Sequence, residues 1–299
     1  MSTGVTAPTA SLASVAEPRT RVKRVWWKRG IFANPIGLTG LVIVAITIFV
    51  AIFAPLIAPY PPGDQGAKRL LSPSWDHIFG TDELGRDTFS RIIYGSRVSL
   101  EVGIIAVFVA LAVGGLLGLI GGFFGGRLDS VIMRFVDILF AFPGLILAIV
   151  IAGLLGPSSR NAMIAIGVIY APAFARVIRG SVLTVEGELY MEAGRVAGAN
   201  NTRLIAKHVL PNIVAPLIVL TTVYLSSAIL AEAGLSFLGL GTQPPEPSWG
   251  GMLNSARSYM ELCPWMAIAP GLAIMFVVLG LNFLGDGLRD ILDPRLRIR

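Results

Sequence analysis

The residue types that usually carry enzymatic or metal chemistry are scarce in this chain. Its single cysteine, Cys263, excludes an intrachain disulfide and a cysteine-rich metal site. The two histidines, His77 and His208, have no second ligand at metal-binding spacing. The sequence also lacks a Walker A phosphate loop, a Gly-x-Ser-x-Gly motif and a His-Glu-x-x-His motif. We therefore expect no catalytic residue and no metal site, and any energy that the protein uses must come from elsewhere.

Four charged residues lie within long apolar runs or near their ends, where an ionised side chain is costly and is a candidate functional group. Arg134 and Asp137 are three residues apart, so on one helix they would share a face and pair with each other. Glu101 and Glu232 are expected near the outer ends of their helices. Two interpretations stay open for Glu232, Asp137 and Glu101: an interfacial charge or internal ion pair, and direct contact with a transported solute.

A short polar segment with several small residues lies between two of the apolar runs. As a helix over residues 188–199, it would place Gly194 and Gly198 on one edge with Ala193 and Ala197 beside them, because residues four apart share a face. A helix face with so little side chain can approach a partner surface closely. The alternative is a solvated loop helix whose glycines only mark turns.

Polar residues of the same segment complete this prediction. Glu192 and Arg195 would remain available for polar contacts with a partner. Asn200 and Asn201 tolerate the left-handed conformation that ends a helix, and Thr202 is placed to cap the next helix. The pattern thus predicts one helix that ends near the two asparagines and a second helix after it.

The composition indicates an integral membrane protein. Hydrophobic residues make up 54% of the 299 residues, charged residues only 14%, and the mean hydropathy is +0.74. The core of a soluble protein could not enclose so much apolar surface. Several runs reach the roughly 20 residues that a helix needs to cross a ~30 Å hydrocarbon layer. Six spans are expected, at 36–58, 98–123, 130–155, 162–183, 213–234 and 265–285, with kinks at Pro143, Pro172, Pro216 and Pro270.

Small residues recur at every fourth position of the second run. They are Ala106, Ala110, Gly114, Gly118 and Gly122. Such a stripe lets another helix approach closely within a membrane. It predicts a structural contact between helices, and a surface that slides during transport is the alternative.

Lysine and arginine are distributed unevenly between the polar segments. With the N-terminus in the cytoplasm, the inner segments hold 17 of the 24 basic residues and the outer segments hold the other 7. The positive-inside rule therefore favours cytoplasmic termini and a cytoplasmic Glu192. This topology explains the net charge of +6 better than nucleic-acid binding does, so no nucleic acid is expected as a partner.

The expected organisation follows from these runs. The first run is longer than the apolar core of a cleaved signal peptide, which favours an uncleaved first span over a signal peptide. The chain then divides into an N-terminal tail and interfacial anchor at 1–35, the first span at 36–58, an extracytoplasmic loop at 59–97, a core with five further spans and the polar segment 184–211 at 98–288, and a C-terminal tail at 289–299.

The polar segment resembles the EAA loop of ABC importer permeases, in which a Glu-Ala-Ala triplet is followed at fixed spacing by a Gly and a Leu-Pro. The matching residues here are Glu192, Ala193, Gly198, Leu210 and Pro211. The sequence departs from the pattern at two positions, because Gly194 replaces the third residue of the triplet and His208 stands where many members have Ile. The resemblance implies that this loop, including Gly194 and Arg195, couples the permease to an ATPase.

Three further blocks are similar to the dipeptide, oligopeptide and nickel class of ABC importer permeases, specifically to the second of its two permease types. They are residues 80–100, 231–253 and 283–297. The resemblance implies an all-α fold of six transmembrane helices with a cytoplasmic coupling helix, the type I importer permease fold. It also implies a protein of a bacterial or archaeal cytoplasmic membrane that carries peptides or similar small polar solutes.

The same resemblance implies the partners of the chain. They are a homologous second permease, two cytoplasmic ATPases that bind ATP and Mg, an extracytoplasmic substrate-binding protein and membrane lipid. The permease itself would bind no cofactor and would not be an enzyme. Two other classes compete: a secondary transporter or channel without an ATPase, and an intramembrane enzyme. A secondary transporter is expected to show internal repeats and buried coupling charges, and an intramembrane enzyme is expected to show converging nucleophile or metal residues. Neither pattern is found in the sequence.

Two outer blocks carry structural expectations of their own. The block 80–100 is polar with balanced charge, and it is expected to form amphipathic surface structure before the second span. The proline-rich stretch 243–249 is expected to be a rigid outer loop with Trp249 at the membrane interface. The resemblance implies that such loops face the substrate-binding protein, and packing on the permease alone is the alternative.

Overall fold

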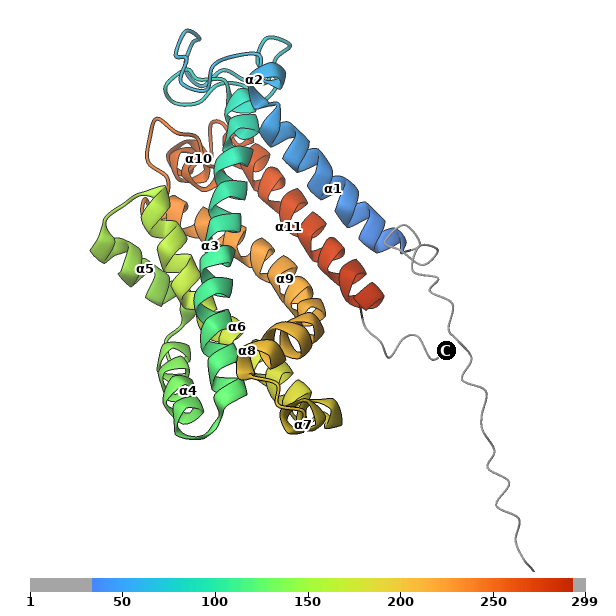
Figure 1. Ribbon diagram of the computed structural model, residues 1–299. Coiled ribbons are helices and arrows are strands. Elements are labelled where there is room, and N and C mark those ends of the chain that lie inside the picture. Colours follow the sequence, from blue (N-terminus) through green and yellow to red (C-terminus); the bar gives the residue numbers. More distant parts are fainter. Residues whose placement is uncertain (1–33, 293–299) are drawn as a thin grey trace, which may run out of the picture.

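The computed structural model describes residues 34–292, which fold mainly into helices (Figure 1). The long helices are α1 (Pro35–Ile52), α3 (Thr88–Phe124), α6 (Ser159–Glu186), α9 (Leu210–Phe237) and α11 (Trp265–Leu292). The shorter helices are α2 (Ala54–Ile57), α4 (Gly126–Phe140), α5 (Gly144–Leu155), α7 (Leu189–Val196), α8 (Asn201–Leu204) and α10 (Trp249–Ala256). Over residues 34–292 the expected all-α membrane fold is confirmed. Most of the expected tails at 1–35 and 289–299 lies outside the described residues.

The third expected span is broken in two. Helices α4 and α5 meet at 89° across the residues that join them. The cause is local, because Pro143 has no N–H to donate and disfavours a helical backbone at Phe142. The kink expected at Pro143 is therefore a complete break. In the described part of the chain five helices are long and apolar enough to cross a membrane, or six if α4 and α5 together form one bent span.

Capping side chains set two helix boundaries away from the expected positions. Helix α3 begins at Thr88, well before the expected start of its span, because the Asp87 carboxylate accepts a hydrogen bond from the Ser90 N–H at 2.7 Å. At the end of α1, the Arg97 guanidinium donates to the carbonyl oxygen of Ile52 at 2.7 Å. Polar side chains thus fix the C-terminal end of α1 and the N-terminal end of α3.

Helix α3 packs closely along α6, and its small residues lie in the contact. A Cβ added at Gly114 would overlap the carbonyl oxygen of Ala171, and one at Gly118 would overlap that of Ala175. At Gly122 an added Cβ would lie 2.9 Å from a side chain of α6. Backbone therefore meets backbone along this contact, which leaves no room for larger side chains.

Glycines also bring α1 and α11 together. An added Cβ at Gly287 would lie 2.5 Å from the Cα of Gly37, and one at Gly40 would overlap the backbone of α11. At the end of this contact the Asn34 side-chain amide donates to the Asp290 carboxylate at 2.9 Å. The first helix is therefore packed on the last one.

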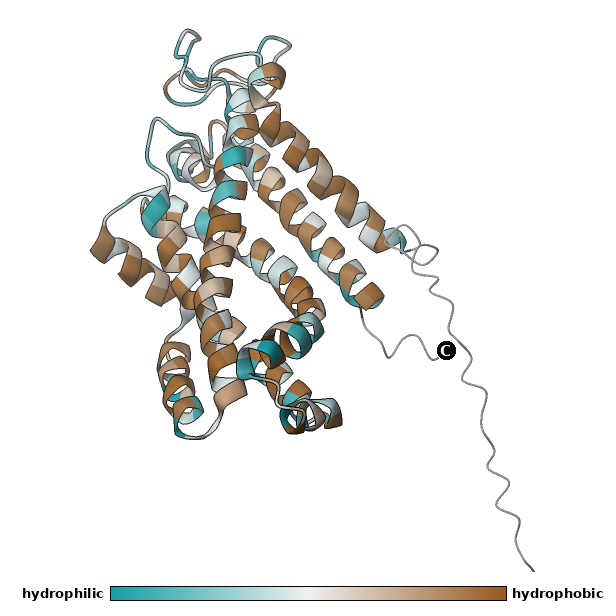
Figure 2. Ribbon diagram, viewed as in Figure 1, coloured by the Kyte–Doolittle hydropathy of each residue, from teal (hydrophilic) through white to brown (hydrophobic). Residues whose placement is uncertain are grey.

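Two polar connections lie at opposite ends of the long helices. In Figure 1 the connection between α2 and α3 is at the top, whereas α7 and the turn between α3 and α4 are at the bottom. Figure 2 shows the long helices brown over most of their length, with hydrophilic residues prominent in the top connection and around α8. This separation places the polar segment 184–211 far from the outer block 80–100.

Candidate functional site

Helix α7 is held to the rest of the chain by one face only. Met191 is fully buried, and so is Leu204 of α8. An added Cβ at Gly194 would lie 2.9 Å from the Leu204 side chain, so this glycine lets α8 pack against α7. The opposite face is bare of contacts, with Leu189 82% and Val196 90% exposed. Two large apolar side chains in water mark a surface that is suited to contact another protein.

The end of α7 is a Schellman motif centred on Gly198. The Ala199 N–H donates to the carbonyl of Gly194 and the Gly198 N–H donates to that of Arg195, both at 3.0 Å. Gly198 has φ = +79°, a conformation that glycine adopts without a steric penalty. No other group of the described chain lies within 4 Å of an added Cβ there, so the backbone alone requires glycine at this position.

The expected roles of the residues after Gly198 were wrong in two respects. Gly198 takes the left-handed conformation in place of Asn200 and Asn201. Asn200 instead caps α8, because its side-chain oxygen accepts a hydrogen bond from the Arg203 N–H at 2.9 Å, and Thr202 lies inside the helix. Both asparagine and threonine favour caps, so local propensity could not decide between them.

The two charged residues expected to contact a partner differ in their surroundings. Arg195 is paired with Glu186 at the end of α6, which ties α7 to that helix. Glu192 is exposed and makes no side-chain hydrogen bond or ion pair within residues 34–292. Ala193, next to it, is exposed too. The group that α7 can offer to a partner is therefore Glu192, flanked by Leu189 and Val196.

Leu210 and Pro211 lie where the segment enters the next long helix. A π-helical turn, η2 (Ile205–Val209), precedes α9, and the Leu210 N–H donates to the carbonyl of Ile205. Pro211 has no N–H, and its ring would clash with the carbonyl four residues earlier, so the backbone widens at this point. Both Leu210 and Pro211 are exposed, whereas Val209 is fully buried.

Several residues of this site were not singled out from the sequence. Leu189 and Val196 are seven apart and share a face with Glu192, a spacing that was visible in the sequence. Met191 and Glu186 hold α7 in place, and nothing in their local pattern distinguishes them from other residues of the loop. Glu186 pairs with Arg195 of α7, and Met191 belongs to the buried core, so these contacts become visible only in the folded chain.

Glu232 is a fully buried carboxylate inside the helix bundle. The Ser236 hydroxyl donates to it at 2.6 Å and the Ser99 hydroxyl at 3.4 Å. Ser236 in turn accepts a hydrogen bond from the Thr242 N–H at 3.0 Å. Glu232 thus joins α3, α9 and the loop after α9, and its side chain is enclosed by the protein.

Asp137 and Glu101 lie on exposed surfaces of spanning segments. Asp137 pairs with Arg176 of α6 at 2.9 Å, so the expected pairing of Arg134 with Asp137 was wrong. Arg176 also lies over the ring of Phe140, with its guanidinium carbon 4.2 Å from the ring centre. Asp137 therefore pairs with Arg176 of another helix, which this stacking holds in place, and not with Arg134 three residues away.

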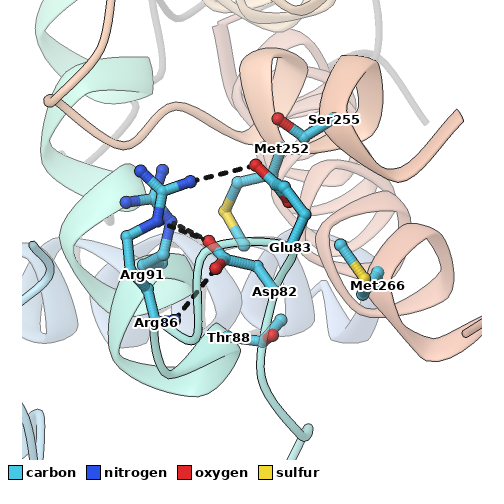
Figure 3. Close-up of a pocket in the computed structure, with 8 residues that line it drawn as sticks. All are labelled: Asp82, Glu83, Arg86, Thr88, Arg91, Met252, Ser255 and Met266. Atoms are coloured by element: carbon cyan, nitrogen blue, oxygen red, sulfur yellow. Dashed lines mark hydrogen bonds and ion pairs between the residues drawn. The ribbon is translucent and has the colours of Figure 1, made fainter. Parts of the chain in front are cut away.

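The outer block 80–100 is largely buried, which corrects the expectation of amphipathic surface structure. Arg86 donates to Asp82 at 2.6 Å and to Glu83 at 3.2 Å, and Arg91 lies 3.5 Å from the same Asp82 (Figure 3). Both arginines are only 6% exposed. The balance of positive and negative charges was the reason to expect a surface position. The charges balance instead because the acidic and basic residues pair with one another in the interior.

Trp249 was also misplaced by the sequence. It is 2% exposed, and its indole N–H donates to the carbonyl of Ile92 at 3.0 Å. An added Cβ at Gly95 of α3 would lie 3.0 Å from its ring. Trp249 therefore anchors α10 to α3, and its ring is packed inside the protein. The exposed part of the proline-rich stretch is residues 243–246.

Within residues 34–292 no group of three or more His, Cys, Asp or Glu side chains is placed to hold a metal ion. The arrangement comprises apolar spanning helices, a surface helix at one end and a buried polar block at the other. The fold and the site together define the permease class of multi-pass membrane proteins.

Comparison with known proteins places the chain within that class. Residues 114–298 match the family described as binding-protein-dependent transport system inner membrane component. Residues 20–73 match the N-terminal transmembrane domain of oligopeptide transport permease C. The chain belongs to this family of ABC importer permeases.

Relatives and solved structures agree with this assignment. The chain is 48% identical to the di/tripeptide transport system permease protein DppC of Pseudomonas aeruginosa, covering 88% of this chain and 89% of that one. It is 43% identical to the glutathione transport system permease protein GsiD of Pectobacterium atrosepticum, covering 92% and 91%. An inward-facing structure of the MetNI methionine ABC transporter is similar in fold, with a TM-score of 0.56 and 18% identity over 68% of this chain and 97% of that one.

Proposed function

We propose that this chain and a homologous second permease form the translocation path of an ATP-driven importer for short peptides or similar small polar solutes. The observation that carries the proposal is α7, whose apolar and acidic face is exposed although its other face is fully packed. The relatives named for dipeptide, di/tripeptide and glutathione transport support the substrate class. An extracytoplasmic binding protein delivers the substrate to the outer loops.

The energy for transport comes from two cytoplasmic ATPases that bind ATP and Mg. They dock on α7 and on its flanking residues, which are Glu192, Ala193, Gly194, Arg195, Gly198, Leu210 and Pro211. The Arg195 to Glu186 pair connects α7 to α6, and the close α6 to α3 contact continues into the spans. A movement of α7 is therefore transmitted to the helices that cross the membrane.

The orientation follows from the distribution of basic residues. Both termini and α7 are cytoplasmic, because 17 of the 24 lysines and arginines then lie on the inner side. This places the buried block around Asp82 and the loop at 243–246 outside. It gives the ATPases and the binding protein opposite ends of the molecule.

Uptake into vesicles tests the proposal. The complete complex is reconstituted into vesicles that hold ATP and Mg inside, where α7 of the right-side-out complexes lies, and the binding protein and a radiolabelled dipeptide are added outside. We expect accumulation that requires both ATP and the binding protein. Accumulation by the permease alone, driven by an ion gradient, would show a secondary transporter instead.

A further inference from the structure

One ion pair in the spanning part of the chain is half exposed. The Arg176 guanidinium of α6 lies 2.9 Å from the Asp137 carboxylate of α4, and the two side chains are 54% and 60% exposed. Arg176 is about 26 Å along α6 from its start at Ser159, and so near the inner edge of a hydrocarbon layer of ~30 Å. The neighbouring Ala175 touches Gly118 in the apolar run of α3, which agrees with this depth.

Lipid is an unfavourable neighbour for such a pair. Charged side chains at membrane depth nearly always face a protein interior or a water-filled path. The exposed side of Arg176 and Asp137 therefore faces water or another protein. Because the chain works as a permease, a water-filled path is the surface that the solute itself meets.

The other ion pair between these two helices is built differently. Arg179 donates to both oxygens of Asp129, at 2.5 and 2.6 Å. These side chains are 32% and 15% exposed, so this pair is more enclosed than the first. It is a bidentate brace that holds α4 on α6. The Arg179 to Asp129 pair thus already connects α4 to α6. The more exposed pair of Arg176 and Asp137 is not needed for that connection.

Both members of the exposed pair have unused bonding capacity. Within the described residues, only one N–H of Arg176 and one oxygen of Asp137 are engaged in a hydrogen bond. The Phe140 ring, 4.2 Å from the guanidinium carbon, holds the guanidinium in place without using its donors. Half-exposed pairs of this kind are weak, so charges of a ligand can replace them.

We propose that Arg176 and Asp137 form a binding site for the two charged ends of a zwitterionic short peptide. Arg176 receives the terminal carboxylate, a planar anion that matches its fork of donors, and Asp137 receives the terminal ammonium. Two extended residues span about 7 Å, so the Arg176 nitrogen and the Asp137 oxygen, now 2.9 Å apart, have to separate by at least about 4 Å to contact both ends of a dipeptide. This inference rests on the proposed peptide substrate and assigns the residues that recognise it.

Direct binding to the permease is the test. The purified complete transporter, without its binding protein, is titrated in a calorimeter with alanyl-alanine, its C-terminal amide and its N-acetyl form. Arg176→Gln should weaken binding of alanyl-alanine by about tenfold, the loss of one charge-assisted contact, and leave the amide unaffected. Asp137→Asn should do the same for alanyl-alanine and leave the N-acetyl form unaffected. Arg176→Lys should restore part of the affinity.

Arg179→Gln is the matched control, because it removes an ion pair between the same helices at a site that no ligand needs. It should lower thermal stability and keep the preference for free termini. The inference is overturned if the wild type binds no peptide, if Arg176→Gln weakens all three peptides equally, or if it dissociates the second permease. Uptake by the wild type is measured separately, so failure here with normal uptake contradicts the site alone.

Discussion

Gly198 and the residues around it show how a single backbone conformation shapes the exposed surface of α7. Its φ of +79° ends α7 and turns the chain toward α8. An L-residue in this conformation costs roughly 1 to 2 kcal/mol. The exposed face of Leu189, Glu192 and Val196 therefore depends on a glycine that touches none of them.

A matched pair of substitutions tests the role of Gly198. Gly198→Ala should lower the free energy of unfolding by about 1 kcal/mol, because alanine is strained at positive φ. Gly180→Ala, in the middle of α6 where an added Cβ meets nothing within 4 Å, should leave stability unchanged or raise it. Thermal unfolding of the purified complex in detergent measures both. Equal destabilisation by the two variants would show that the backbone conformation does not require glycine at position 198.

Residue roles differed in how far the sequence could reveal them. Glu192 was singled out because its motif lies within one local segment, and the structure shows that its side chain is exposed. The burial of Glu232 and the partner of Asp137 were not, since each depends on residues from another helix. Tryptophan is a residue type typical of membrane interfaces, but the indole N–H of Trp249 donates to a carbonyl of α3 inside the fold. Local pattern carries no information on such distant partners.

At the scale of elements, α3 and α6 approach each other until backbone meets backbone along the stripe of small residues. Gly118→Leu should separate the two helices, since an added side chain meets the backbone of α6 directly. Overpacking of this kind costs about 1 to 3 kcal/mol, and the yield of assembled complex should fall. Gly271→Leu is the control, because an added Cβ there meets nothing within 4 Å in the described chain. Equal yields from the two variants would contradict a close-packed contact.

Elements with strong periodicity or long apolar runs were predictable, and those shaped by tertiary partners were not. Five of the six expected spans correspond to α1, α3, α6, α9 and α11, although α1 ends before its expected end and α3 begins well before its expected start. The break between α4 and α5 was anticipated only as a kink, because Pro143 determines where the helix ends but not the angle that follows. The burial of the 80–100 block depends on ion pairs that require α3 and its preceding loop to fold together.

Across the whole molecule, the long helices connect α7 at one end to the loop between α2 and α3 at the other (Figure 1). The central claim is that α7 is the point where an ATPase transmits force. Val196 is 90% exposed, so its replacement should not disturb the fold of the chain itself. Any loss of function would then come from a partner.

Retention of the ATPase on the permease, with substrate-stimulated ATP hydrolysis in vesicles, tests this claim most directly. Glu192→Ala removes a charged contact worth about 1.5 to 3 kcal/mol, and Val196→Asp places a charge in an apolar contact. Each should reduce both quantities at least about tenfold at unchanged membrane insertion. Glu246→Ala, an exposed carboxylate on the outer loop, should leave ATPase retention unchanged. Wild-type retention and hydrolysis in Glu192→Ala and Val196→Asp would contradict the account.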